Sequence, residues 1–229
     1  MNNRFIKISD LKRVPFLELD KENVKYTYYK KDKEKLKNQY TIQDILTIIE
    51  SSHLTEDYTN LMQNFNTSIL YKSDGHGINH NVRVCFFAYI ISIKEKVFHE
   101  DFKLIMEACK YHDIGRQNDI EDESHGKRSS EKLTFLESGY SKEELNYIKT
   151  IVTCHSLEDI EFEPLAVQNH IQDIDRCKKM HEILKDADAL DRVRLEEPFV
   201  DINYLRTETS KKMVVFAHEL FYNYNKFFK

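Results

Sequence analysis

Residues Phe102 to Arg116 read FKLIMEACKYHDIGR, and this stretch decides the fold and the chemistry that we expect of the chain. Apolar side chains recur through residues 102–111 at helical spacing, which predicts an amphipathic helix. His112 and Asp113 follow directly, and Gly115 marks the end of the helical pattern. An imidazole beside a carboxylate at a helix end suits a site for a divalent transition metal.

Helical patterns continue on both sides of this stretch. Apolar residues at three- and four-residue steps predict further helices from about 41 to 49 and over 58–70, 82–93, 126–137, 141–155, 172–195 and 210–228. The 229 residues include only 5 glycines and 3 prolines, which are too few for the many turns of a sheet protein. We therefore predict an all-α helical bundle, in which residues 1–65 form a small N-terminal appendage packed on a core domain of residues 66–229.

The amino-acid composition indicates which kinds of partner the protein binds and in which cellular compartment it lies. A net charge of −5 gives no strong signal for nucleic-acid binding. No segment approaches the roughly 20 apolar residues that a membrane span needs, and no secretory signal is visible. The four cysteines are widely spaced without a C-x-x-C motif, which favours reduced, buried thiols. We expect a cytoplasmic protein without a membrane partner, as a monomer or homodimer.

Other histidines and aspartates lie in distinctive contexts along the predicted helices. His80 lies at the end of the glycine-containing stretch SDGHGINH, residues 73–80, just before a long apolar helix. His125 precedes Gly126, and His155 ends an apolar helical run. Asp188 lies within KDADALDR, residues 185–192. Together with the His112-Asp113 pair, these residues stand out from the other histidines and aspartates of the chain by their contexts.

The order and contexts of these residues resemble the HD-domain metal-dependent phosphohydrolase superfamily. Its signature is His…His-Asp…Asp on an all-helical core, and the resemblance covers roughly residues 70–195. The resemblance implies an HD-domain-like bundle whose four core ligands are His80, His112, Asp113 and Asp188.

His125 and His155 resemble the extra ligands in the branch of this family that holds two metals. This implies that Asp113 bridges both ions, and that His125 and His155 complete the second one. Imidazole and carboxylate ligands suit one or two divalent ions of Fe, Mn, Co, Ni or Zn. The alternative is that these two histidines are core or capping residues. His181, two turns before Asp188 on the same helix face, is a separate candidate for a substitute ligand.

Positively charged residues near the motifs are candidate phosphate-binding groups. They are Arg83, Arg116, Lys127 and Arg192. The alternatives are structural salt bridges for Arg83 and Arg192, and ordinary surface cations for Arg116 and Lys127. With Asp113 and Arg116, His76 is a candidate catalytic residue, as a proton donor to the leaving oxygen. The acidic loop 119–123 is either a lid over the site or a solvated segment.

The resemblance implies a phosphohydrolase or phosphodiesterase that hydrolyses a nucleotide or another small phosphate ester through a metal-activated water. Enzymes of the family that it resembles act on dinucleoside polyphosphates, cyclic dinucleotides, deoxynucleotides or guanosine alarmones, and the sequence leaves these open. The stretch around His76, His80 and Arg83 also resembles phosphodiesterase domains of some bacterial effectors. The alternative function is a degenerate HD module, either a nucleotide-binding sensor or a partner-binding helical domain.

Overall fold

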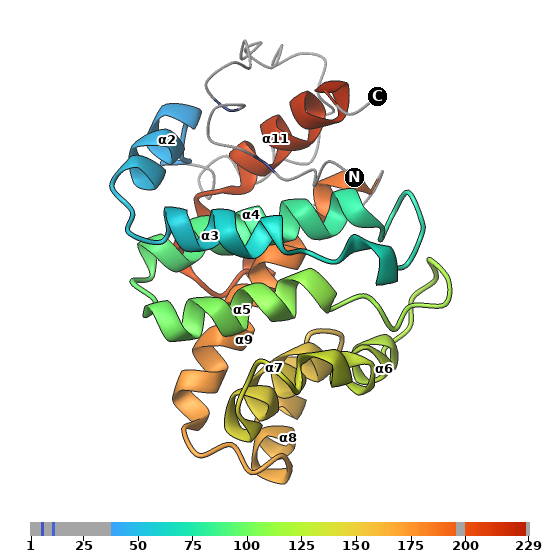
Figure 1. The fold of residues 1–229 in the computed structure, drawn as a ribbon. Coiled ribbons are helices and arrows are strands. Elements are labelled where there is room, and N and C mark those ends of the chain that lie inside the picture. Colours follow the sequence, from blue (N-terminus) through green and yellow to red (C-terminus); the bar gives the residue numbers. More distant parts are fainter. Residues whose placement is uncertain (1–5, 7–10, 12–37, 196–199, 228–229) are drawn as a thin grey trace.

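The computed structural model describes residues 6, 11, 38–195 and 200–227, and these residues form an all-α fold as predicted (Figure 1). No strand occurs in this part of the chain. The prediction for residues 1–37 lies, apart from Ile6 and Leu11, outside the described residues.

The described chain folds into α-helices joined by short 3-10 turns. The α-helices are α2 (Ile42–Glu50), α3 (Thr55–Gln63), α4 (Ile78–Lys94), α5 (His99–Tyr111), α6 (His125–Glu131), α7 (Lys142–Cys154), α8 (Phe162–Gln168), α9 (Ile174–Leu190), α10 (Glu208–Lys211) and α11 (Val214–Phe227). The 3-10 turns are η1 (Thr67–Ile69), η2 (Leu133–Leu136), η3 (Asp159–Glu161), η4 (Asp191–Arg194) and η5 (Ile202–Tyr204).

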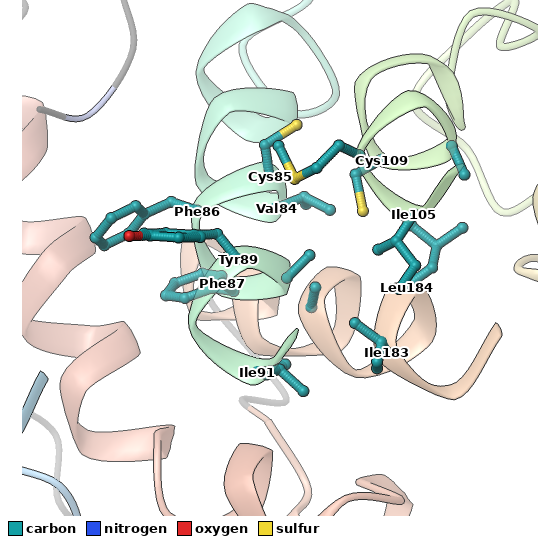
Figure 2. Close-up of a cluster of buried hydrophobic side chains, with 14 of the residues drawn as sticks. Val84, Cys85, Phe86, Phe87, Tyr89, Ile91, Ile105, Cys109, Ile183 and Leu184 are labelled. Atoms are coloured by element: carbon teal, nitrogen blue, oxygen red, sulfur yellow. The ribbon is translucent and has the colours of Figure 1, made fainter. Parts of the chain in front are cut away.

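Helix α4 lies at the centre of the bundle and packs against both α5 and α9. Every residue from His80 to Ser92 is buried, so this helix is covered on all sides. Figure 2 shows Val84 on the side of α4 that faces Ile105 of α5 and Leu184 of α9, with Phe86 on another side. The apolar core therefore fixes the relative positions of three helices that carry candidate ligands.

The remaining helices cover this centre on two sides (Figure 1). Helix α7 packs on α5 and α9, and α6 and α8 pack on α7. Helix α2 packs on α4, and α3 packs on α5. The described part of the predicted appendage, residues 38–65, thus packs on the bundle. Tyr40 N–H also donates to Lys212 O at 2.8 Å.

Local signals explain where several helices begin. Thr41 with Asp44, and Ser141 with Glu144, form the reciprocal hydrogen bonds of a capping box, each at the start of a predicted helix. The four cysteines are buried and free, in agreement with the expectation of reduced thiols. None of the helices in the described part of the chain has the length and apolarity that crossing a membrane requires.

Three predicted helices are shorter than their sequence patterns. The segments predicted over 58–70, 126–137 and 172–195 each change from an α-helix to a 3-10 turn or a break before their expected end. Helix α8 was not predicted, because its seven residues are too few to show helical periodicity and it has no side-chain N-cap.

Candidate metal centre

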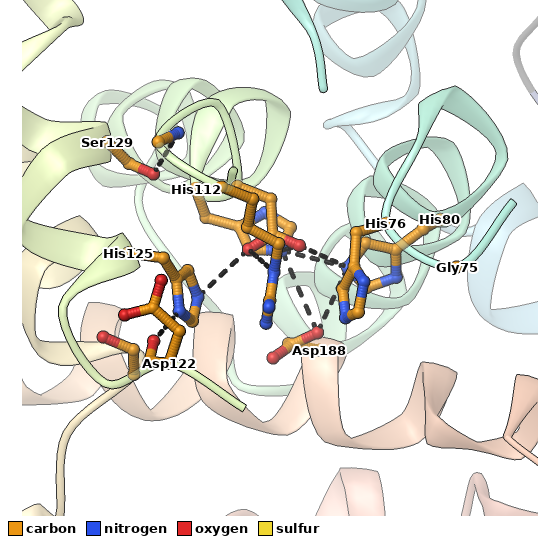
Figure 3. Close-up of polar contacts among 12 residues, drawn as sticks. Gly75, His76, His80, His112, Asp122, His125, Ser129 and Asp188 are labelled. Atoms are coloured by element: carbon orange, nitrogen blue, oxygen red, sulfur yellow. Dashed lines mark hydrogen bonds and ion pairs between the residues drawn. The ribbon is translucent and has the colours of Figure 1, made fainter. Parts of the chain in front are cut away.

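The six predicted metal ligands come together at the ends of five helices, and Figure 3 labels four of them, His80, His112, His125 and Asp188. His80 lies in the first turn of α4, His125 begins α6, and Asp188 lies in the last turn of α9. His112 and Asp113 directly follow α5, and His155 directly follows α7. Five of these side chains are buried and Asp188 is half-buried, so the cluster opens to solvent on the side of α9.

A first group of ligand atoms surrounds His80 Nε2. This nitrogen lies 3.1 Å from His112 Nε2, 3.4 Å from Asp113 Oδ2 and 3.3 Å from Asp188 Oδ1. His112 Nε2 lies 3.6 Å from Asp113 Oδ2 and 3.9 Å from Asp188 Oδ1. The ligand atoms of His80, His112 and Asp188 therefore form one group of possible metal ligands, within 4.8 Å of one another, and Asp113 Oδ2 lies beside it.

A second group lies on the other side of Asp113. Asp113 Oδ1 is 3.1 Å from His125 Nε2 and 3.6 Å from His155 Nε2, and these two nitrogens are 2.8 Å apart. His112 also lies close, since its ligand atom and those of Asp113 and His155 fall within 4.8 Å of one another. The two oxygens of one carboxylate thus face two different sets of histidines.

The four histidines are held with Nε2 toward the cluster by hydrogen bonds at Nδ1. His112 Nδ1 donates to Cys109 O at 2.9 Å and His155 Nδ1 to Val152 O at 2.6 Å, while His125 Nδ1 donates to Asp122 O. Because a carbonyl oxygen only accepts, these bonds place the proton on Nδ1 and leave a lone pair on Nε2. Such bonds are typical of metal-binding histidines, whose second nitrogen is oriented by a carbonyl or carboxylate.

Charge in the cluster favours cation binding. Burial lowers the pKa of His112 to about 3, so its imidazole is neutral. Burial alone would raise the pKa values of Asp113 and Asp188, yet the surrounding histidines hold both well below the usual range. His112, Asp113 and Asp188 are therefore in the protonation states that bind metals.

The donor set fits a divalent transition metal. A bond of about 2.1 Å to each ligand sets neighbouring ligand atoms about 3.0 Å apart in octahedral geometry and about 3.4 Å apart in tetrahedral geometry. The observed separations are 3.1 to 3.9 Å in the first group and 2.8 to 3.6 Å in the second. These buried His and Asp residues could therefore hold a metal ion.

Asp191 supports the first group from behind. Its Oδ2 accepts from His80 Nδ1 at 2.7 Å, while Arg83 donates from Nε to Oδ1 at 2.5 Å and from a terminal nitrogen to Oδ2 at 3.0 Å. Although burial and Arg194 oppose protonation of His80, the adjacent carboxylates raise its pKa to about 9. Arg83 is buried, so the structure gives it the salt bridge that was the alternative to its phosphate-binding role.

His76 lies at the edge of the cluster, with its ring 5.7 Å from that of His80. Its Nδ1 is 2.9 Å from Asp119 Oδ1, so the acidic loop contacts the site through this residue. Burial lowers the pKa of His76, and the Asp119 carboxylate partly offsets that effect. Arg116 joins the same edge, since its Nε donates to Asp113 Oδ1 at 3.0 Å.

Other predicted residues lie apart from the cluster. Lys127 and Arg192 are exposed, on α6 and η4. His181 is buried against Phe162, with ring centroids 4.6 Å apart, and is not among the grouped ligands. The sequence analysis did not select Asp191 or Arg194. The available signal was their spacing, because Asp191 lies three residues after Asp188 and Arg194 lies three residues after Asp191.

Together these contacts define a buried set of imidazoles and carboxylates with arginines and a histidine at its edge. The arrangement can hold cations and can donate or accept a proton at His76. Comparisons of this chain with protein-family models, with curated proteins and with solved structures found no match.

Proposed function

We propose that this chain is an HD-type metal-dependent phosphohydrolase or phosphodiesterase that hydrolyses a nucleotide or another small phosphate ester. The order His80, His112-Asp113, Asp188 resembles the signature of that superfamily. One or two divalent ions of Fe, Mn, Co, Ni or Zn would be held by these residues with His125 and His155.

The observation that carries the proposal is the position of Asp113 between two sets of histidines. Oδ2 faces His80 and His112, and Oδ1 faces His125 and His155. The facing Nε2 atoms of His125 and His155, 2.8 Å apart, would repel through their lone pairs unless a cation or proton lies near both. Divalent ions, when bound there, would supply Lewis acidity toward a phosphoryl oxygen and would activate a water molecule.

Side chains at the edge of the cluster supply the remaining functions that the proposal needs. Asp119 accepts from Nδ1 of His76, which leaves Nε2 of His76 to exchange a proton with the leaving oxygen. Arg116 is held by Asp113 through Nε and by Ile120 O at 3.4 Å through a terminal nitrogen. Its other terminal nitrogen can donate to a phosphate oxygen.

Metal analysis coupled to a hydrolysis screen tests this function. Purified protein should contain transition metal in stoichiometric amount and hydrolyse phosphomonoesters or phosphodiesters in a panel of nucleotides. Asp113→Asn should lose both properties, while His99→Ala, which alters a half-exposed histidine paired with Asp57, should keep them. The enzymatic function would be excluded if wild-type protein took up no transition metal and showed no hydrolysis after addition of Mn²⁺.

The same experiment separates two metals from one. His125→Ala and His155→Ala should each reduce the metal content while the first group keeps its ion. Full metal content and activity in both variants would indicate a mononuclear centre. Protein that holds metal and binds nucleotides without hydrolysing any of them would instead support the sensor function.

A further inference from the structure

We propose that Arg194 binds the anionic group of the substrate, together with Arg116, at the edge of the cluster beside His76. This inference rests on the proposed function and adds to it a substrate-binding residue. Arg194 lies at the end of η4, three residues after Asp191, in a part of the chain from which we had selected only Arg192.

Arg194 is anchored next to His76 by two backbone carbonyls. Its Nε donates to Gly75 O at 2.7 Å, and a terminal nitrogen, Nη1, donates to Asp191 O at 3.0 Å. The side chain is only 7% exposed, so the guanidinium is fixed in position instead of extending into solvent. A group fixed in this way loses little conformational freedom when it binds a ligand.

The guanidinium of Arg194 has hydrogen-bond donors that its anchoring contacts do not use. A guanidinium has five N–H groups, and the contacts of Arg194 use Nε and Nη1. Its Nη2 has no hydrogen-bond partner within the described parts of the chain. Arg116 shows the same pattern, because its Nε and Nη1 are engaged with Asp113 and Ile120 while Nη2 remains available.

Arg194 is not required to neutralise Asp191. The carboxylate of Asp191 already accepts two hydrogen bonds from Arg83 and one from His80, whereas Nη1 of Arg194 lies 3.7 Å from Oδ2. A purely structural salt bridge would be redundant there. Arg194 instead lies at the edge of the cluster, where its Nε donates to the carbonyl oxygen of Gly75, the residue before His76.

Metal loading would increase the need for an anion at this point. Two divalent ions carry more positive charge than the carboxylates of Asp113 and Asp188 supply in compensation. Arg194 and Arg116 would then lie beside a positive centre, and repulsion among these charges is relieved by an anion with several oxygens. A phosphoryl group, with at least two non-bridging oxygens, matches two guanidinium groups and the metals together.

Binding of inorganic phosphate to the metal-loaded protein tests the inference directly. The variants are Arg194→Lys, which keeps the charge but loses the fork of donors, and Arg194→Gln, which loses both. Lys178→Gln is the control, because it removes an exposed positive charge near the N-terminal end of α9, whereas Asp188 lies in the last turn of that helix. Calorimetry gives the dissociation constant, and metal content and the thermal unfolding midpoint are measured on each variant.

We expect both Arg194 variants to bind phosphate about tenfold more weakly than wild type, with unchanged metal content, since one charge-assisted hydrogen bond is lost. Lys178→Gln should bind phosphate as wild type does. Unchanged phosphate affinity in the Arg194 variants would overturn the inference and leave the proposed function intact. Loss of metal and of thermal stability in both Arg194 variants would make Arg194 a structural residue, which also overturns it. Absence of metal from wild type would overturn the proposed function itself.

Discussion

Arg83 and Asp191 form a buried ion pair whose main effect should be on stability. Both side chains are almost fully buried, and Arg83 makes two hydrogen bonds to the carboxylate. Removing one partner leaves the other charge buried without full compensation, which typically costs several kcal/mol.

We therefore expect Arg83→Met to destabilise the protein by about 3–5 kcal/mol, measured by urea denaturation. Arg192→Met, at an exposed arginine, should change the free energy of unfolding by less than about 0.5 kcal/mol. If Arg83→Met instead kept wild-type stability and raised KM, the phosphate-binding role expected from the sequence would be the correct one.

His181 should make the protein sensitive to mild acid. Burial, with a contribution from Lys185, lowers its pKa to about 3, well below the value of about 6.5 for an unfolded histidine. Below pH 6.5 the unfolded state binds a proton that the folded state does not, so stability falls as pH falls, until about pH 3. The effect is absent above pH 7, where the residue is neutral in both states.

Replacing His181 with leucine should remove this contribution. Between pH 6 and pH 4 the wild type should lose about 1.4 kcal/mol per pH unit more than His181→Leu, measured by urea denaturation at each pH. His53→Gln, at an exposed histidine, should retain the wild-type slope. Equal slopes for wild type and His181→Leu would show that His181 is protonated in the folded state.

At the scale of elements, the second group of ligands depends on how closely α6 approaches the end of α5. A Cβ atom on Gly115 would lie 2.3 Å from Ser129 N and 2.5 Å from His125 O, both backbone atoms of α6. Only a residue without a side chain permits this approach, which brings His125 to Asp113. Gly115 N–H also donates to Ser129 Oγ at 2.8 Å.

Gly115→Ala should push α6 away and disrupt the second group of ligands while sparing the first. We expect a destabilisation of about 1–3 kcal/mol and a loss of metal from the second group only, measured by metal analysis and denaturation. Gly139→Ala is the control, because its Cβ would meet its nearest neighbour, Leu136 O, at an ordinary 3.8 Å. Unchanged metal content in Gly115→Ala would mean that the position of α6 does not determine metal binding by the second group of ligands.

Helix ends were the elements that the sequence predicted least well, and this affected the site. If α9 had continued as an α-helix, Arg192 would follow Asp188 by one turn on the same face. The chain instead tightens to a 3-10 turn at Asp191, where side chains three residues apart eclipse one another. This change brings Arg194, and not Arg192, beside Asp191. The periodicity of the sequence cannot show this change from α-helix to 3-10 turn, because Arg192 and Arg194 are only two positions apart.

For the whole molecule, the sequence predicted the fold class, and the six candidate ligands that the resemblance implied lie close to one another. Apolar periodicity predicted the helices of the bundle, and the order of His and Asp motifs identified side chains that are far apart in the chain, such as His80 and Asp188. The contact between His76 and Asp119 and the support from Asp191 could not be predicted, because they depend on loop and turn geometry. The packing of α4, α5 and α9 on one another brings these loops and turns together.

A metal ion bound at the candidate centre should therefore act as a cross-link of the bundle. Its candidate ligands come from the ends of α4, α5, α6, α7 and α9, and an ion that binds only the folded state adds its binding free energy to stability. Metal at 100 times its dissociation constant adds about 2.7 kcal/mol. For a chain of this size that corresponds to roughly 5–10 °C in the unfolding midpoint.

We expect chelation to lower the midpoint by that amount, measured by circular dichroism, and readdition of Mn²⁺ to restore it. Ca²⁺ should not restore it, because Ca²⁺ prefers oxygen ligands and the centre is rich in imidazole. Asp113→Asn should show a lower midpoint that chelator does not change further, since the carboxylate facing both sets of histidines is lost. A midpoint independent of chelator in metal-containing wild type would mean that the ion binds without holding the helices together.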